Sequence, residues 1–142
     1  MTNAMLRNAT PADQDSVLSV FLDAWTKLCL ELGIDIDMGN LPRFRIDATK
    51  VALVDDELVG FFRLNESREL LERIYVNPVY QHSGVGGLLL KNAEELGAKE
   101  LWVDEGNVNA QRFYESHGWA DSGLRAPGYL VPESVMLRYE RK

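Results

Sequence analysis

Three glycines, Gly84, Gly86 and Gly87, occur where the chain changes from a strand pattern to a helix pattern. Residues 70–76, before the glycines, are rich in branched and aromatic side chains, and apolar residues recur at helical spacing over 85–96. The first turn of a helix has unpaired backbone amides and the positive end of the helix dipole, and glycine leaves those amides open to a ligand. The junction therefore suits a phosphate group, although a flexible turn would also explain the glycines.

The glycine segment fits one family pattern and excludes two common nucleotide motifs. A dinucleotide-binding fingerprint needs glycine where this chain has Leu89, and the Gly-Lys-Ser/Thr triplet of a Walker loop is absent. Residues 81–87 read Gln-x-x-Gly-x-Gly-Gly, which resembles the Gln/Arg-x-x-Gly-x-Gly/Ala signature of the GCN5-related N-acetyltransferases. Residues 107–119 read Asn-x-x-Ala-x-x-x-Tyr-x-x-x-Gly-Trp, which resembles a second signature of that family. Two matches in the right order make the resemblance specific.

The resemblance implies that acetyl-CoA is the co-substrate. In the family, amides of the glycine segment hold the pyrophosphate, and main-chain groups of the preceding strand pair with the pantetheine arm like an added strand. The side chain aligned with Asn107 also reaches that arm, and it can cap a helix as well. The cofactor-binding residues implied are Ile74, Tyr75, Val76, Gln81, His82, Ser83, Gly84, Val85, Gly86, Gly87 and Asn107.

Acetyl transfer to an amine needs a neutral amine, a donor to the developing oxyanion and a proton for the departing thiolate. The resemblance implies that Tyr114 supplies this proton; packing as a core aromatic is the alternative. Some relatives carry a glutamate base at the position of Trp102, so that base is absent, and Trp102 either lines the acceptor pocket or packs in the core. We expect Glu72, in phase with Ile74 and Val76, to replace it through a water chain; an ordinary strand-end charge is the alternative.

Composition favours one globular domain over residues 1–142. The chain is 46% hydrophobic and 26% charged, with a net charge of −7, which argues against nucleic acid and is compatible with a cationic amine acceptor. No apolar run is long enough for a membrane span, no signal-peptide core is visible, and no residue cluster has zinc-site spacing. The single cysteine, Cys29, lies among apolar residues and suits a buried thiol better than a nucleophile. We expect a cytoplasmic protein without a metal.

The elements imply a mixed α/β fold. Thr10 and Pro11 begin a helix that extends to Gly33, and the resemblance implies that this stretch is split into two helices flanking the acceptor site. Residues 33–48 read as a loop, which is either a substrate-facing lid or a solvated connection.

The remaining elements alternate strands with two helices. One helix follows the glycine segment, and a short second helix capped by Asn107 ends before Gly118. Trp119 and a loop containing Pro127, Gly128 and Pro132 precede the last strand. We therefore expect a mixed, mostly antiparallel central sheet flanked by helices. The expected strands are 5–7, 50–54, 58–64, 70–76, 100–103 and 135–139.

These observations predict an acetyl-CoA-dependent N-acetyltransferase that moves an acetyl group to a primary amine by direct transfer in a ternary complex. The acceptor is a small molecule or a peptide amine. A non-catalytic acyl-CoA-binding sensor is the alternative, and a nucleotide-binding regulatory domain is a third. The family resemblance also leaves a homodimer through the last strands open.

Overall fold

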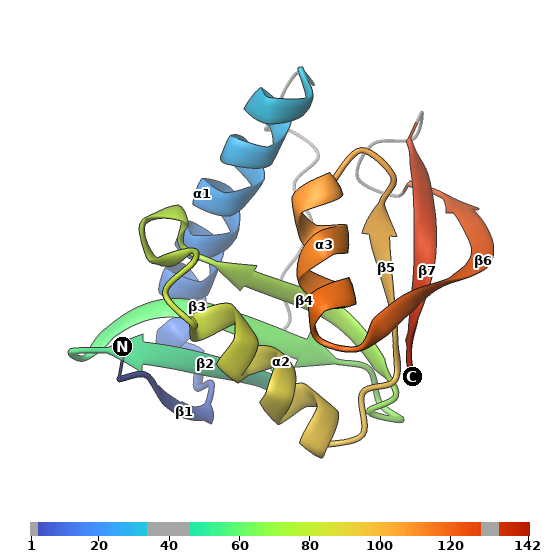
Figure 1. Cartoon of the computed structure of the whole chain (residues 1–142). Helices are drawn as coiled ribbons and strands as arrows, with labels where there is room; N and C mark the ends of the chain where they lie inside the picture. Colours follow the sequence, from blue (N-terminus) through green and yellow to red (C-terminus); the bar gives the residue numbers. More distant parts are fainter. Residues whose placement is uncertain (1–2, 34–45, 129–133) are drawn as a thin grey trace.

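The described residues form a seven-stranded sheet with strand order β1-β2-β3-β4-β5-β7-β6 (Figure 1). The structure is a computed structural model that describes residues 3–33, 46–128 and 134–142. Neighbouring strands are antiparallel except β4 and β5, which are parallel, so the expected mixed, mostly antiparallel sheet is confirmed. The strands are β1 (Met5–Asn8), β2 (Thr49–Val54), β3 (Glu57–Leu64), β4 (Leu70–Val76), β5 (Glu100–Asp104), β6 (Trp119–Pro127) and β7 (Val135–Arg141).

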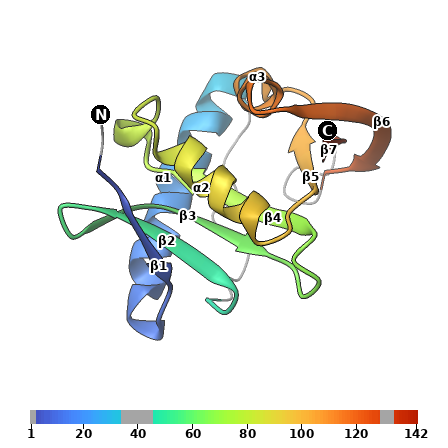
Figure 2. The same cartoon turned by 60° about the horizontal axis from the view of Figure 1, so that its bottom comes forward.

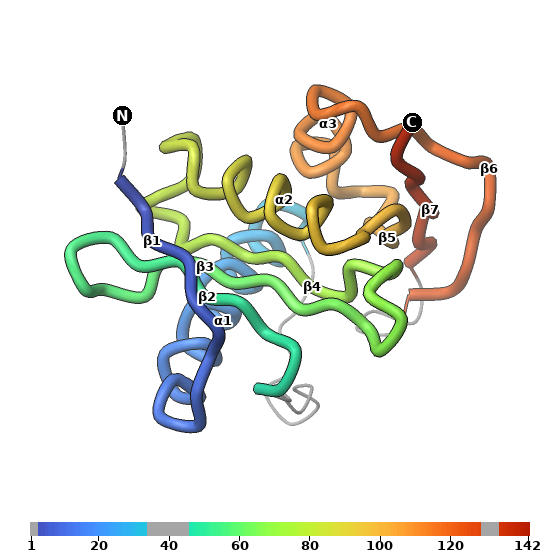
Figure 3. Tube along the Cα trace, turned by 90° about the horizontal axis from the view of Figure 1, so that it is seen from below, coloured from blue at the N-terminus to red at the C-terminus, as the bar shows by residue number. Residues whose placement is uncertain are grey.

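Helices cover both faces of the sheet, as Figures 2 and 3 show. On β3, Phe61 packs with α1 on one face, whereas its neighbour Phe62 packs with α2 on the other, because successive side chains of a strand alternate. Helix α3 joins the α2 side through Tyr114. Within the described part of the chain, none of the helices is long and apolar enough to cross a membrane. The helices are α1 (Gln14–Leu32), α2 (Val85–Glu95) and α3 (Val108–Ser116).

Helix α1 is continuous from Gln14 to Leu32 and ends at Gly33, which has the left-handed φ of +68° that favours glycine. The break expected from the family resemblance therefore does not fall within these residues. The expected loop at 33–48 lies mostly outside the described residues, because 34–45 are not described. Cys29, on α1, is 1% exposed, as expected for a structural thiol, and burial raises its pKa.

Residues 119–127 form strand β6 at the edge of the sheet, a strand that the sequence analysis did not identify, and the loop expected around Pro127 begins only at the end of this strand. Their Asp, Ser, Gly and Pro content resembles a loop, but pairing with β7 supplies the backbone hydrogen bonds. The ladder is interrupted between Asp121 and Arg125, and Pro127 stands at the end of the strand. Irregular pairing and proline are tolerated at a sheet edge, where one side of the strand needs no partner.

Strands β4 and β5 separate soon after they meet. Only Leu70 and Leu71 of β4 pair with β5, although β4 continues to Val76 and stays paired with β3. In the β3–β4 ladder, Arg63 pairs with Arg73 but Leu64 pairs with Leu71, so Glu72 is an extra residue on β4. Such a bulge bends and twists its strand. Beyond it β5 turns away from β4, as Figure 1 shows, and a gap opens within the sheet.

The start of α1 is fixed to β1 by a polar cluster. The Asp13 carboxylate accepts hydrogen bonds from both terminal nitrogens of Arg7, at 2.7 and 2.9 Å, and from the backbone N–H of Thr10 at 2.8 Å. The expected helix start at Thr10 and Pro11 is therefore confirmed. The guanidinium of Arg7, followed by the Thr10 amide, holds the pKa of Asp13 far below its ordinary value. This cluster orients α1 over the sheet.

Replacing Asp13 with Asn should lower the free energy of unfolding by about 1–2 kcal/mol at pH 6, because it removes a charge-assisted hydrogen-bond pair. A depressed carboxyl pKa stabilises the fold above the unfolded-state pKa, and this contribution is lost as the pH falls towards the folded-state value. The difference between wild type and Asp13→Asn should therefore shrink below about pH 4. Urea unfolding at pH 6 and pH 3 measures both values, and a difference that stays constant would contradict the assignment.

Candidate functional site

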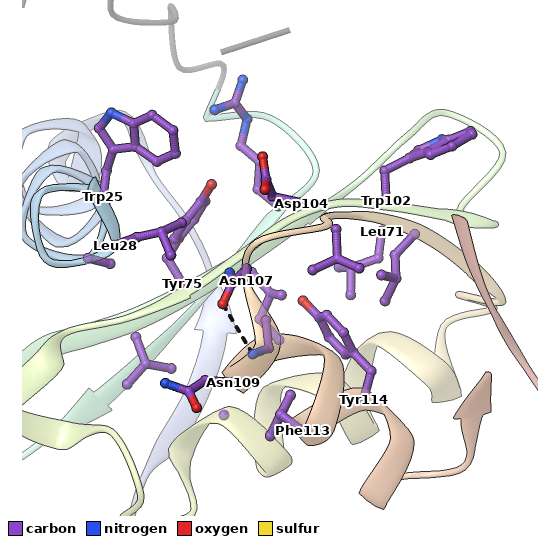
Figure 4. A pocket seen from close by; sticks show the side chains of 18 of the residues that line it. Trp25, Leu28, Leu71, Tyr75, Trp102, Asp104, Asn107, Asn109, Phe113 and Tyr114 are labelled. Atoms are coloured by element: carbon purple, nitrogen blue, oxygen red, sulfur yellow. Dashed lines mark hydrogen bonds between the residues drawn. The ribbon is translucent and has the colours of Figure 1, made fainter. Parts of the chain in front are cut away.

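A cleft of about 860 Å³ occupies the gap between β4 and β5 and is lined from both sides of the sheet. Figure 4 shows Trp25, Tyr75, Asp104 and Trp102 on one side of the two strands and Tyr114 on the other. We call these the α1 side and the α3 side. The cleft therefore brings together residues that are far apart in the sequence and gives one space access to both sheet faces.

The glycine segment forms the N-terminal end of α2 at the edge of the cleft. None of the amides of residues 82–87 donates a hydrogen bond to an acceptor in the described residues. His82 and Gly84 have positive φ values of 66° and 95°, which turn the chain sharply before the helix begins. The Ser83 hydroxyl donates to the Tyr80 carbonyl and so braces the turn rather than facing a ligand. The segment therefore presents unbonded amides at a helix N-terminus, which is an arrangement that can accept an anion.

The side chain of Gln81 connects this turn to two other elements. Its amide nitrogen donates to the carbonyl of Val76 at 3.2 Å, and its oxygen accepts from Lys27 Nζ on α1 at 2.8 Å. Lys27 also lies 3.9 Å from Glu31. Gln81 thus positions the end of β4, and Lys27 brings a positive charge beside the glycine segment. The sequence analysis did not identify Lys27, because a lysine on an amphipathic helix carries no motif.

Gly86 and Gly87 of α2 lie against the side chains of Phe113 and His117. A Cβ at Gly86 would lie 3.4 Å from the ring of Phe113, and a Cβ at Gly87 would lie 3.2 Å from Nε2 of His117. The His117 ring is held by a 2.7 Å contact between Nδ1 and the carbonyl of Phe113. Asn107 begins α3, and its side-chain oxygen accepts from Ala110 N–H at 3.2 Å, so the expected cap is confirmed. The two signature segments therefore meet in the cleft.

Tyr114 projects from α3 towards the cleft, and its hydroxyl has no hydrogen-bond partner among the described residues (Figure 4). The residue is 8% exposed, and burial raises the pKa of its phenol above the ordinary value. The hydroxyl therefore stays protonated at physiological pH. It can donate one hydrogen bond or one proton to a group in the cleft.

Glu72, the bulge residue of β4, lines the cleft and forms an ion pair with Arg63 of β3. The sequence analysis expected Glu72 to be in phase with Ile74 and Val76. The bulge breaks that alternation, so Ile74 and Val76 pack with the α2 core while Glu72 turns to Arg63. Arg63 also donates to the carbonyl of Asp47 at 3.1 Å. Glu72 is therefore a fixed carboxylate rather than an isolated strand-end charge.

Trp102 lines the cleft. This position favours the expectation that it lines a pocket over the expectation that it packs in the core. Leu101 and Val103 of β5 are buried in the core with α2 and α3, so the alternate residues Trp102 and Asp104 face the α1 side. Asp104 was missed by the sequence analysis. Its alternation with Trp102, at the end of a strand beside a signature segment, was the available signal. Across the described part of the chain, no three His, Cys, Asp or Glu side chains form a candidate metal site.

The chain belongs to the acetyltransferase (GNAT) family, whose model matches residues 15–119. An uncharacterized N-acetyltransferase encoded in the pepI 3′ region of Lactobacillus delbrueckii subsp. lactis is 36% identical over 81 residues. The match covers 46% of this chain and 47% of that protein, so it spans about half the length of the curated relative. The resemblance drawn from the two signature segments is thereby confirmed.

Solved structures of the same fold cover almost the whole chain. A GCN5-related N-acetyltransferase from Rhodopseudomonas palustris has a TM-score of 0.74 and 21% identity, with 99% of this chain and 95% of that chain covered. Ard1 from Thermoplasma volcanium has a TM-score of 0.72 and 23% identity, with coverages of 97% and 96%. PaiA N-acetyltransferase from Thermoplasma acidophilum, solved in complex with coenzyme A, has a TM-score of 0.69 and 17% identity, with 99% coverage of both chains. At these identities the similarity establishes the fold.

Proposed function

We propose that this protein is an acetyl-CoA-dependent N-acetyltransferase that transfers the acetyl group directly to a primary amine within a ternary complex. The observation that carries the proposal is the cleft, which joins a row of unbonded amides to the hydroxyl of Tyr114 and then to the opposite sheet face. A thioester entering from the α3 side and an amine entering from the α1 side would meet between β4 and β5. Direct transfer needs this kind of shared space.

The pyrophosphate of the cofactor would bind at the amides of residues 82–87. Neutral donors at the positive end of a helix dipole stabilise an anion without a strongly basic surface, which suits a chain of net charge −7. His82 and Val85 would contribute their backbone amides, while Gln81 and Ser83 support the turn through their own hydrogen bonds. Lys27, held by Gln81, would add one positive charge nearby.

The pantetheine arm would pair with the unpaired edge of β4. Asn77 N–H donates to Val59 of β3, and the carbonyl of Tyr75 lies against Gly60 of β3. Because backbone groups alternate along a strand, those of Ile74 and Val76 face the gap instead. We therefore assign the main-chain contacts to Ile74 and Val76, while Tyr75 contributes its side chain to the α1 side.

The two candidate catalytic groups match the proton movements of the reaction. The amine nitrogen would attack the thioester carbonyl, and collapse of the tetrahedral intermediate would break the carbon–sulfur bond. Tyr114 would give its proton to the departing thiolate, because its hydroxyl remains protonated and unpartnered. Glu72 would receive the proton of the amine through water, with its carboxylate oriented by Arg63. Asn107, whose oxygen serves the helix cap, would present its NH₂ group to the pantetheine arm.

Replacing Gly86 with Glu should abolish acetyl-CoA binding, because the Cβ position at Gly86 faces Phe113 and Val76 across the cleft. A glutamate there would place a carboxylate beside the anionic pyrophosphate. Gly86→Ala is the matched control: its Cβ makes ordinary contact with Phe113, and alanine favours the helix by about 1 kcal/mol. Calorimetric titration of acetyl-CoA should show binding by the alanine variant and none by a folded glutamate variant. Retained affinity in Gly86→Glu would refute the placement.

Replacing Tyr114 with Phe should lower kcat by about 10²-fold or more while leaving acetyl-CoA affinity and thermal stability nearly unchanged. Stability is expected to persist because the hydroxyl makes no hydrogen bond within the described residues. Tyr139→Phe provides the comparison, since it removes a phenol that donates to Glu115 at 2.8 Å outside the cleft. That variant should lose stability but keep kcat. Wild-type turnover in Tyr114→Phe would show that another group protonates the departing thiolate.

Replacing Glu72 with Gln should lower kcat/KM for the amine by about 10²-fold, because an amide cannot accept the proton of the amine. Gln can still accept a hydrogen bond from Arg63, so the variant retains part of the contact that fixes the bulge. Rates with saturating acetyl-CoA, measured from pH 5 to 9, test this. An unchanged kcat/KM would remove Glu72 as the base.

A further inference from the structure

The α1 side of the cleft has features that define the acceptor more narrowly than the family does. Three aromatic side chains, Trp25, Tyr75 and Trp102, line it together with the apolar Leu28 and Met136. Tyr75 is fixed edge-on against Phe21, with ring centroids 5.0 Å apart, and Trp25 stacks on the same Phe21 at 6.2 Å. These rigid aromatic walls favour a ligand with an apolar or flat body.

One carboxylate in this lining has no counter-ion. Glu31 lies near Lys27, and Glu72 pairs with Arg63. Asp104 forms no ion pair with any cation in residues 3–33, 46–128 and 134–142. Its Oδ1 accepts from Gly106 N–H at 2.8 Å, which fixes the side chain and leaves Oδ2 for a ligand. A partly buried, oriented and unpaired carboxylate is a binding group for a cation.

Asp104 is held close to the end of α1. A Cβ at Gly106 would lie 3.2 Å from Leu32 Cδ2, so the glycine lets α1 approach the loop that orients the carboxylate. Figure 4 shows Asp104 projecting on the same side of the strands as Trp25, Tyr75 and Trp102. The C-terminal end of α1 also carries the negative end of the helix dipole, which further favours a positive ligand. The charge and the aromatic walls therefore belong to the same part of the cleft.

Resting on the proposed N-acetyltransferase function, we propose that the acceptor is a primary amine on an aromatic or similarly apolar body, and that Asp104 binds its ammonium group. The aromatic side chains would enclose the body while Asp104 Oδ2 receives the charged nitrogen. Proton loss from the bound ammonium, which the proposed reaction requires, then frees the nitrogen lone pair for attack on the thioester.

Arg73 is the group that could favour a different acceptor, an α-amino acid with a free carboxylate. It also lines the cleft, but the aromatic side chains lie on the same side of the strands as Asp104, which forms no ion pair within the described residues. A carboxylate next to the amine would be brought towards Asp104 along with the nitrogen, and like charges repel. We therefore expect amines without an adjacent carboxylate to be better acceptors than the corresponding amino acids.

The test uses 2-phenylethylamine, its carboxylated counterpart phenylalanine, and the hydrophilic polyamine spermidine. Each is first titrated calorimetrically into the wild-type protein loaded with coenzyme A, and acetylation is then followed by thiol release from acetyl-CoA. We expect 2-phenylethylamine to bind and to have a kcat/KM at least about tenfold above that of the other two. Absence of binding, or preference for phenylalanine or spermidine, would overturn the acceptor class.

Asp104→Asn and Glu105→Gln separate the role of Asp104 from a general charge effect. Glu105 is the exposed next residue and does not line the cleft, so its variant removes the same charge without touching the proposed contact. We expect Asp104→Asn to weaken 2-phenylethylamine binding by about tenfold or more, with acetyl-CoA affinity unchanged and Glu105→Gln equal to wild type. Equal amine binding in wild type and Asp104→Asn would refute the assignment.

Failure of this inference and failure of the proposed function give different results. If wild-type protein does not bind acetyl-CoA, the proposed function itself is wrong. If it binds acetyl-CoA and acetylates an amine of another class, only the acceptor assignment is wrong.

Discussion

The arrangement of the site depends on the early separation of β4 and β5. These strands share two residue pairs and then part, because an extra residue at Glu72 bends β4 while β5 keeps its full pairing with β7 on its other edge. The gap would be costly in an ordinary sheet, since buried backbone groups need hydrogen-bond partners. Here the open edge of β4 lines a cleft, where a ligand with its own donors and acceptors can pair with it. The separation of β4 from β5 thus creates the open strand edge that the proposed cofactor site uses.

Charge is distributed unevenly across this gap. On one side, backbone amides of α2 and the Lys27 ammonium provide positive potential near the glycine segment. Elsewhere in the lining of the cleft, Asp104 and Glu72 provide carboxylates. This separation allows an acidic protein to hold a proposed anionic co-substrate and a proposed cationic acceptor in adjoining space. Net charge, which averages over the surface, contains no information about this local arrangement.

The sequence predicted the elements with strong local signals and missed those set by tertiary contacts. The hairpin of β2 and β3 was correct because its turn residues, Asp55 and Asp56, can adopt the positive φ values that such a turn requires. The capped start of α3 at Asn107 was correct for the same local reason. Strand β6 was missed because its pairing depends on β7 rather than on its own composition.

For the candidate site, the sequence likewise identified the residues that belong to motifs and missed those whose position depends on tertiary structure. The glycine segment and Asn107 carry motifs, and the structure brings their two segments together. The phase of Glu72 was wrong because a one-residue bulge reverses strand alternation and leaves no signal in composition. Asp104 and Lys27 were missed because the role of a charged residue outside a motif depends on its neighbours on other elements. In this chain those neighbours are the other residues that line the cleft for Asp104, and Gln81 for Lys27.

The position of Tyr114 shows how a side chain can be oriented without a hydrogen bond. Its ring contacts Phe113, Trp119 and Tyr139 at centroid distances of 5.4, 6.4 and 6.3 Å, so packing fixes the direction of the phenol. Tyr139, by contrast, uses its hydroxyl to bond Glu115. The Tyr114 hydroxyl has no partner among the described residues and is accessible from the cleft, so it is free to bond a ligand there. Aromatic contacts fix the ring of Tyr114, and its oxygen is directed to the cleft. The hydroxyl is therefore available to donate a hydrogen bond to a ligand bound there.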